Sequence, residues 1–172
     1  MEIRALRESD DRSRFRSGDP DLDRFFHLFA GQNQFKHYVG VSYVAVEEAH
    51  IFGFATVSPG HLEIDSLPIA ARRKLPRYPL PVLRLARLAV DASAQGQGLG
   101  AQLLKFVLML AVRMASEFGC VGVIVDAKPQ AIDFYEKYGF IRVEAKGHLQ
   151  PIPMFLPMRA IAAATESGPT ER

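Results

Sequence analysis

The chain has 172 residues, of which 48% are hydrophobic and 23% are charged, and its formal net charge at pH 7 is +2. This length suits one domain with a substantial core, and the composition excludes a disordered or collagen-like chain. So small a net charge does not by itself indicate nucleic-acid binding. A single cysteine, Cys120, excludes an internal disulfide and is compatible with a reducing cytoplasm, which is the location we expect.

Membrane and metal signals are weak in this sequence. No apolar run approaches the length of a membrane span, and we expect no signal peptide before the first strand. The five histidines are scattered and Cys120 stands alone, so no spacing suits a metal site. We therefore expect no membrane contact and no bound metal.

The first part of the chain predicts a strand, two helical pieces and a hairpin. Asp19 suits a helix N-cap, and Pro20 suits the first helical position. Glu48-Ala49-His50 separates two apolar or alternating runs, which is typical of a hairpin. The predicted elements are a strand at 1–6, helices at 21–29 and 31–37, and strands at 39–47 and 51–58, with 62–65 as an extension.

The second part alternates strands and helices. Its predicted elements are a basic helix at 70–75, a strand at 82–90, a helix at 101–118 capped by Gly119, strands at 121–126, 140–144 and 153–159, and a helix that starts at Pro129. This order predicts an α/β domain over residues 1–160, in which a mixed sheet has helices on both faces. Residues 161–172 are predicted to form a frayed tail.

A glycine-rich turn, Gln95 to Gly100, lies between the strand at 82–90 and the long helix. Glycines let a ligand approach the backbone, and the first N–H groups of a helix are unpaired donors at the positive end of its dipole. The turn matches neither the dinucleotide motif nor the P-loop motif. It therefore predicts a phosphate cradle of another kind, and the alternative is a tight strand-to-helix connection without a ligand.

Two motifs carry a resemblance to a known superfamily. Gln95, Gly98 and Gly100 form Q-x-x-G-x-G, which resembles the acetyl-CoA pyrophosphate loop of the GCN5-related N-acetyltransferases (GNAT). Residues 131–140, AIDFYEKYGF, resemble the F-Y-x-x-x-G-F signature of the same superfamily. The resemblance implies the GNAT fold, a mostly antiparallel mixed sheet of six to seven strands whose splayed central strands hold acetyl-CoA.

A narrower resemblance is to the acetyltransferase toxins of toxin–antitoxin pairs. The matching segments are 17–26, 30–34, 85–91 and 154–158. The resemblance implies acetylation of the α-amine of aminoacyl-tRNA, a block of translation, a ribbon–helix–helix antitoxin as partner and a possible homodimer. No direct DNA binding by this chain alone is expected. The sequence departs from the pattern at Ser17 (usually cysteine), at Ala86 (usually glycine) and over Phe35 to Val41.

The same resemblance assigns roles to residues. Tyr135 is implied to be the general acid that protonates the departing sulfur, because a phenol is protonated at neutral pH. The alternative is that Tyr135 is a core aromatic residue, as Phe134 and Tyr138 could also be. The implied cofactor contacts are Leu88, Ala89, Val90, Gln95, Gly96, Gln97, Gly98, Leu99, Gly100, Ala101 and Phe134. The sequence shows no convincing general base.

Six cations lie between positions 72 and 87, and their clustering suits contact with RNA phosphates. The alternative is a solvated basic helix followed by strand-edge arginines. Alternation along a strand puts Arg84 and Arg87 on opposite faces, so we expect only Arg87 to face the acceptor. The predicted RNA contacts are Arg72, Arg73, Lys74, Arg77 and Arg87.

Three functions are therefore compatible with the sequence. The first is an acetyl-CoA-dependent toxin that acetylates aminoacyl-tRNA. The second is an ordinary GNAT enzyme that acetylates a small-molecule amine, a protein N-terminus or a lysine. The third is an acyl-CoA-binding protein without turnover. Tyr135 and the complete glycine loop argue against the third, and the toxin-like motifs favour the first.

Overall fold

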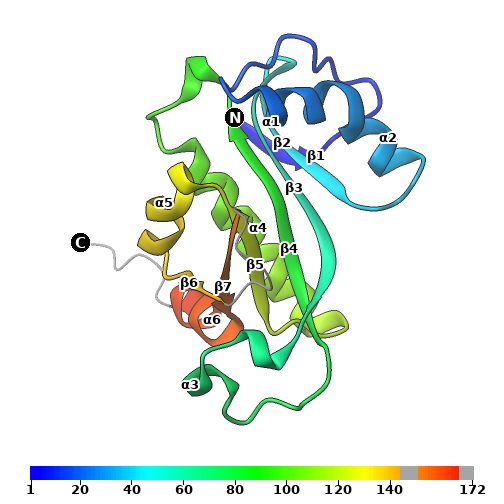
Figure 1. The fold of residues 1–172 in the computed structure, drawn as a ribbon. Helices are drawn as coiled ribbons and strands as arrows, with labels where there is room; N and C mark the ends of the chain where they lie inside the picture. Colours follow the sequence, from blue (N-terminus) through cyan, green and yellow to red (C-terminus); the bar gives the residue numbers. More distant parts are fainter. Residues whose placement is uncertain (144–150, 167–172) are drawn as a thin grey trace. The chain divides into compact units, whose positions relative to one another are not determined.

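In a computed structural model, the chain divides into two compact units. The first unit comprises residues 1–58 and 85–107, and the second comprises residues 59–84 and 108–172. The structure describes residues 1–143 and 151–166 (Figure 1). Strands β3 and β4 and helix α4 contribute residues to both units.

The first unit contains the sheet order β1-β2-β3-β4. Its elements are β1 (Glu2–Ala5), α1 (Pro20–Arg24), a π-helical turn (Phe25–Phe29), α2 (Ala30–Phe35), β2 (Val41–Glu47), most of β3 (His50–Leu62), the second half of β4 (Leu80–Val90), a 3-10 turn (Ala92–Ala94) and the first half of α4 (Leu99–Glu117). β1 and β2 pair antiparallel with Ile3 opposite Ala45, and β2 and β3 pair antiparallel with Val44 opposite Phe54. The predicted hairpin is confirmed.

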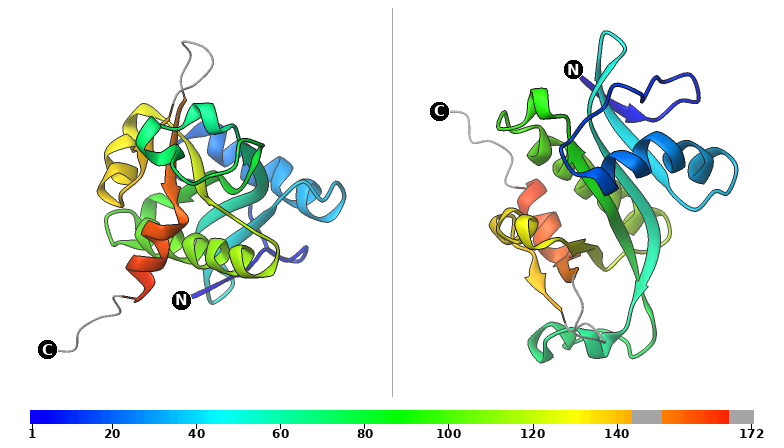
Figure 2. Two further views of the ribbon diagram at one scale, coloured as in Figure 1. Left: turned by 90° about the horizontal axis from the view of Figure 1, so that it is seen from below. Right: turned by 45° about the horizontal axis from the view of Figure 1, so that its top comes forward.

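Helix α1 begins where the sequence predicts. The Asp19 side chain accepts hydrogen bonds from the backbone N–H groups of Asp21 and Leu22, and Pro20 occupies the first turn. An aspartate cap of this kind stabilises a helix by about 1 kcal/mol. The helical backbone then continues without a break through the π-helical turn into α2, whereas the sequence predicts two pieces. In Figure 2, α1 and α2 lie beside β2 and β3.

Alternation along β2 explains why helices cover both faces of this sheet. Val44 belongs to an aromatic cluster with Phe15, Phe26 and Phe54, and the Phe26 and Phe54 rings stack with centroids 4.2 Å apart. The next residue, Ala45, points to the opposite face and belongs to a second cluster with Leu99 and Leu103 of α4. The first cluster packs under α1 and the π-helical turn, and the second packs under α4.

The second unit contains the sheet order β4-β5-β7-β6. Its elements are a 3-10 turn (Ile64–Ser66), α3 (Ile69–Arg72), the first half of β4, the second half of α4, β5 (Gly122–Ala127), a 3-10 turn (Pro129–Ala131), α5 (Ile132–Lys137), β6 (Ile141–Arg142), β7 (Ile152–Pro157) and α6 (Met158–Glu166). β7 pairs antiparallel with both β5 and β6. The expected class, a mostly antiparallel α/β sheet with helices, is confirmed.

The predicted basic helix is wrong over its second half. Helix α3 ends at Arg72, Arg73 has extended backbone, and Lys74 has a φ of +68°. Pro76 explains why the helix does not reach Leu75, because a proline disfavours helical backbone at the residue before it and lacks the N–H that would pair with the Arg72 carbonyl. The segment from Arg73 to Arg77 is therefore an irregular basic connection.

The C-terminal predictions also need correction. The predicted strand at 153–159 ends at Pro157, and residues 158–166, which include the start of the predicted tail, form α6. Ile161 is fully buried, and α6 packs on β5 and β7, so these contacts stabilise a helix that the small side chains do not predict. Glu144, the predicted end of a strand, and residues 167–172 of the predicted tail lie outside the described residues.

Helix α4 is the longest helix described. It runs from Leu99 to Glu117, and Gly119 follows with a φ of +106°, as a C-terminal cap requires. By length and hydropathy alone it could cross a membrane. Leu103, Leu104 and Val107 are buried in the fold, however, and a core helix has the same composition.

Candidate active site

The glycine-rich turn connects β4 to α4 within the first unit. Gly96 and Gly98 have φ values of +76° and +82°, which side chains other than glycine rarely adopt, and the space where their Cβ atoms would stand is open. The Gln102 N–H donates to the Gly98 carbonyl at 3.2 Å, in the first turn of α4. The N–H groups before it have no helical acceptor, so an exposed, donor-rich backbone lies at the start of α4.

This turn fits a pyrophosphate, because it offers an open backbone and the positive end of a 19-residue helix. The residues of the predicted cradle, Gln95 to Ala101, therefore lie together at the start of α4. Leu88, Ala89 and Val90 form the end of β4, as the sequence predicts, and the Ala89 side chain is buried. Their contact with a cofactor stays a prediction.

The Gln95 side chain is held inside the protein through its amide nitrogen. Its Nε2 donates to the Ser17 carbonyl at 2.7 Å and to the Val90 carbonyl at 2.9 Å, so both amide hydrogens are used. Gln95 therefore connects the turn to the segment before α1. Its contact with a cofactor stays a prediction, for which the backbone and the side-chain oxygen remain.

Asp91 supports the same turn, and sequence analysis missed it. Its carboxylate accepts from the Arg16 N–H at 2.9 Å and from the N–H and hydroxyl of Ser93 at 3.0 and 2.6 Å. Burial alone would raise the pKa of Asp91, but these hydrogen bonds outweigh it and lower the pKa below its usual value. The Asp-x-Ser spacing at a strand end was the available signal.

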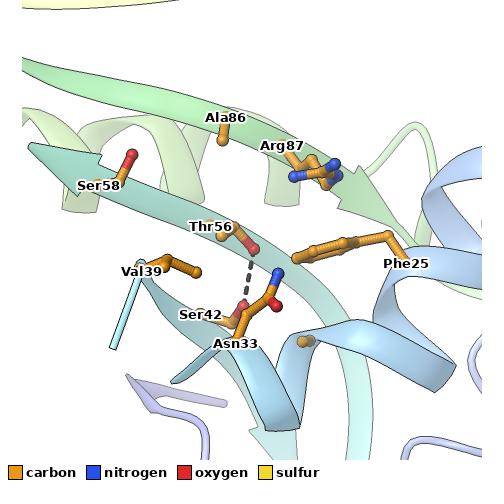
Figure 3. A pocket seen from close by; sticks show the side chains of 10 residues that line it. Phe25, Asn33, Val39, Ser42, Thr56, Ser58, Ala86 and Arg87 are labelled. Atoms are coloured by element: carbon orange, nitrogen blue, oxygen red, sulfur yellow. Dashed lines mark hydrogen bonds between the residues drawn. The ribbon is translucent and has the colours of Figure 1, made fainter. Parts of the chain in front are cut away.

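A cavity of about 140 Å³ lies in the first unit (Figure 3). Its lining residues come from the π-helical turn, α2, the connection between α2 and β2, and strands β2, β3 and β4. They are Phe25, Ala30, Asn33, Val39, Gly40, Ser42, Thr56, Ser58, Ala86 and Arg87. Phe25 and Arg87 lie at one end, and Val39 and Ser58 lie at the other. Except for Arg87, none of these residues was selected from the sequence as a site residue.

Arg87 is held by an aromatic ring. Its Cζ lies 3.7 Å from the centroid of the Phe25 ring, which is a close cation–π contact. Partial burial lowers the pKa of the Arg87 guanidinium, which stays cationic at neutral pH because its ordinary pKa lies above 12. Within residues 1–143 and 151–166, the Arg87 side chain has no hydrogen bond or ion pair.

Ser42 and Thr56 face each other across β2 and β3 and form the polar floor of the cavity. Their hydroxyl oxygens lie 2.7 Å apart, and both side chains are buried. Polar residues at inward positions of apolar strands were the signal that could have indicated this site, because buried hydroxyls cost free energy unless they are paired.

Tyr135 lies in the second unit, on α5. Its ring is buried and has edge contacts with Phe134 and Phe140, at centroid distances of 5.1 and 5.3 Å. Burial raises the pKa of Tyr135 above its usual value near 10. Its hydroxyl makes no hydrogen bond with another described residue, so the phenol proton is available to a ligand.

The predicted RNA contacts separate into three groups. Arg72 donates to the carbonyls of Leu67 and Asp65, which ties its side chain to its own turn. Arg73, Lys74 and Arg77 are exposed. The Arg84 guanidinium, in contrast to that of Arg87, pairs with the Asp126 carboxylate at 2.7 Å. That Arg87 faces the acceptor stays a prediction.

Comparison with known proteins agrees with this architecture. The model of the acetyltransferase (GNAT) domain matches residues 39–142, which is more than half of the chain. The chain therefore belongs to the GNAT family of acetyltransferases. A tRNA-acetylating toxin of Mycobacterium tuberculosis (strain ATCC 25618 / H37Rv) is 34% identical over 140 residues, which cover 80% of this chain and 82% of the relative.

Two solved structures share the fold closely. AtaT complexed with acetyl-methionyl-tRNAfMet superposes with a TM-score of 0.84, at 26% identity, over 95% of this chain and 98% of that one. AtaTR bound with AcCoA has a TM-score of 0.79, at 27% identity, over 95% of this chain and 97% of that one. The resemblance to acetyltransferase toxins is therefore confirmed.

Proposed function

We propose that this chain is an acetyl-CoA-dependent N-acetyltransferase that acetylates the α-amine of aminoacyl-tRNA and so acts as a toxin that blocks translation. The 34% identity with a tRNA-acetylating toxin, over 80% of this chain, carries the proposal. The complete glycine turn and the buried phenol support it, because that transfer needs both a place for the cofactor's phosphates and a proton donor.

Acetyl-CoA, when bound, supplies the thioester carbonyl that is attacked and the thiolate that leaves. The open backbone of Gly96 and Gly98, with the N–H groups that begin α4, would hold its pyrophosphate. Leu88 to Val90 would supply main-chain contacts to the pantetheine arm. These roles stay proposals, as do the contacts of Gln97, Leu99, Gly100, Ala101 and Phe134.

Tyr135 would give its proton to the departing sulfur. Because burial raises the pKa of this phenol, the phenol remains protonated at neutral pH. The Phe134 and Phe140 rings restrict the position of the Tyr135 ring, so the hydroxyl is held ready before the reaction begins.

The attacking amine must be neutral. The cavity lining contains no carboxylate and no histidine, so it offers no general base. An aminoacyl ester has an amine that loses its proton readily, so a dedicated base is not required.

The experiment is transfer of label from acetyl-CoA to a pool of charged tRNA. Wild-type protein should label the RNA, and Tyr135→Phe should lower the rate by about 10²–10⁴-fold, the usual contribution of a general acid. Tyr138→Phe is the matched control, because Tyr138 is a partly exposed neighbour on the same segment. Unlabelled RNA together with acetylated small amines would reject the toxin and leave an ordinary GNAT enzyme. If the protein binds acetyl-CoA but forms no acetylated product, it is the third possibility, an acyl-CoA-binding protein without turnover.

The pH dependence of kcat tests the role of Tyr135 separately. Since burial raises its pKa above about 10, the acid form persists and no loss of rate from phenol ionisation is expected below pH 10. A decline that begins near pH 8 or 9 in the wild type and disappears in Tyr135→Phe would contradict this assignment.

We also propose a cytoplasmic location, a ribbon–helix–helix antitoxin as partner and a homodimer. These proposals rest on the resemblance to the acetyltransferase toxins. A short reading frame of ribbon–helix–helix character next to this gene, whose product suppresses both toxicity and tRNA acetylation, is the expected result. Expression of the chain alone that leaves translation unaffected would contradict the toxin assignment.

The single-domain assignment over residues 1–160 stays a prediction. The two compact units share β3, β4 and α4, which favours cooperative unfolding. One transition in urea, at the same midpoint by fluorescence and circular dichroism, is the expected result.

A further inference from the structure

Tyr38 combines two features that are uncommon for a tyrosine. Its side chain is 84% exposed, and its φ is +55°, in the left-handed region that bulky residues rarely adopt. The chain reverses here after α2, where the His37 N–H binds the Gln32 carbonyl and the Val39 N–H binds the Asn33 carbonyl. Glycine or asparagine would be the ordinary choice at such a reversal.

The other positive φ values of non-glycine residues in the same unit have a local explanation. Glu48 and Ala49 both have positive φ because they form the two-residue turn between β2 and β3. The positive φ of Tyr38 closes the C-terminal end of α2, but that position needs only glycine or asparagine, and the exposed tyrosine ring gains little from packing. A strained backbone that presents an exposed ring indicates a functional role for that ring.

The position of Tyr38 connects it to the cavity. The next two residues, Val39 and Gly40, line the cavity, and Val39 lies at the end away from Arg87, so a ligand that reached both Tyr38 and Arg87 would run along the cavity (Figure 3). Gly40 lies close against β3, because a Cβ atom on it would stand 2.9 Å from the Val57 carbonyl oxygen. The backbone that carries Tyr38 is therefore fixed at the rim of the cavity.

The Arg87 guanidinium makes this site suitable for an anionic ligand. A guanidinium carries five N–H donors and no acceptor, and none of these donors has a protein acceptor among the described residues. The Phe25 ring covers one face of the guanidinium and leaves its edge for a ligand. A phosphate or carboxylate matches such an edge through paired hydrogen bonds.

We propose that Tyr38 is a stacking platform for an unpaired base at the 3′ end of an RNA substrate, and that Arg87 binds a phosphate of the same strand at the adjacent cavity. A nucleotide combines a planar ring with an anion, and exposed aromatic rings beside cations are how proteins hold single-stranded nucleic acid. This inference rests on the proposed function and names the part of the substrate that is read. Tyr38 lies in the 35–41 segment, where the sequence departs from the toxin pattern.

The test is binding of deacylated tRNA that carries 2-aminopurine at its 3′-terminal position, at one fixed salt concentration. Stacking on Tyr38 should quench the emission of this base. Tyr38→Leu should remove the quenching and raise Kd by roughly 5- to 100-fold, the range for one base–aromatic stack. Tyr38→Phe, which keeps a ring, should bind like the wild type. Tyr38→Asn tolerates positive φ and should show the same loss as Tyr38→Leu, so the result does not depend on the fold of one variant.

Phe118→Leu is the matched control, because Phe118 is 73% exposed and lies just beyond the end of α4. It should leave Kd and quenching unchanged. If Tyr38→Leu shows the same quenching and the same Kd as the wild type, the proposal is overturned. The exposed ring would then be a contact for a protein partner instead.

Acetylation assays separate this inference from the proposed function. If the wild type acetylates aminoacyl-tRNA and Tyr38→Leu does so with the same KM, the stacking role fails and the proposed function stands. If the wild type acetylates no RNA yet shows quenching that depends on Tyr38, the proposed function fails and the stacking role stands. Absence of both signals in the wild type rejects both.

Discussion

The cations predicted to contact RNA include members of two regions of this molecule, and the two regions hold them differently. In the first unit, Arg87 is partly buried, lies over the Phe25 ring and faces a cavity. In the second unit, Arg73, Lys74 and Arg77 project from an irregular connection into solvent. A desolvated, oriented cation can recognise one group in one geometry, whereas solvated cations attract any polyanion and are screened by salt.

The largest effect is expected at the cavity. Arg87→Gln should lower kcat/KM for aminoacyl-tRNA by roughly 10- to 150-fold, because hydrogen bonds to a charged group contribute about 1.5–3 kcal/mol. Arg87→Lys should recover only part of this activity, since an ammonium cannot form the paired hydrogen bonds. Steady-state acetylation at fixed salt measures both. Equal activity of Arg87→Lys and wild type would mean that Arg87 acts through charge alone, and the contrast between the two regions would disappear.

A smaller effect, with a different signature, is expected in the basic connection. Replacing Arg73, Lys74 and Arg77 together by glutamine should weaken tRNA binding mainly at low salt. It should also reduce the slope of log Kd against log salt by about 0.7–0.9 for each phosphate that these side chains neutralise in the wild type. Kd is measured from about 50 to 200 mM salt, the range over which such binding changes most, with Lys105→Gln on α4 as an exposed-cation control. If the slope of log Kd against log salt does not change, these residues form a solvated surface that does not contact RNA.

The smallest effect is expected at Arg84, which occupies the same strand as Arg87. Its ion pair with Asp126 is partly exposed, and such pairs contribute about 0.2–1 kcal/mol. Arg84→Gln should therefore change the free energy of unfolding in urea by less than about 1 kcal/mol. Acetylation should stay within about twofold of wild type, the activity equivalent of a few tenths of a kcal/mol. A decrease as large as that of Arg87→Gln would show that position in β4, and not the unpaired guanidinium, decides the effect.

Local sequence features were sufficient wherever the physical cause lies within a few residues. The side chain of Asp19 caps α1 through N–H groups two and three positions away, and this prediction is confirmed. The glycines at 96, 98 and 119 adopt the positive φ values that their places in a turn or cap require. The spacing of apolar residues likewise predicted α4 and the β2–β3 hairpin, because these periods follow from backbone geometry.

Tertiary contacts decided the elements that were missed. Residues 158–166 have few large apolar side chains, and they form α6 because Ile161 is buried where the helix packs on β5 and β7. The composition of the basic segment predicts a helix, but the backbone departs from helical geometry at Arg73, ahead of Pro76. Burial of one residue and the covalent restraint of a proline outweigh propensities of a few tenths of a kcal/mol per residue.

The candidate site likewise has one part that local motifs predict and one part that only tertiary contacts bring together. The glycine turn and Tyr135 were recognisable as motifs, because their chemistry belongs to short segments of chain. The cavity was not, since Phe25, Asn33, Ser42, Thr56 and Arg87 come from separate elements and meet only when the first unit folds. The raised pKa of Tyr135 and the guanidinium of Arg87, unpaired among the described residues, are likewise absent from the sequence. Desolvation depends on which distant residues surround a group, and only the packed structure specifies those neighbours.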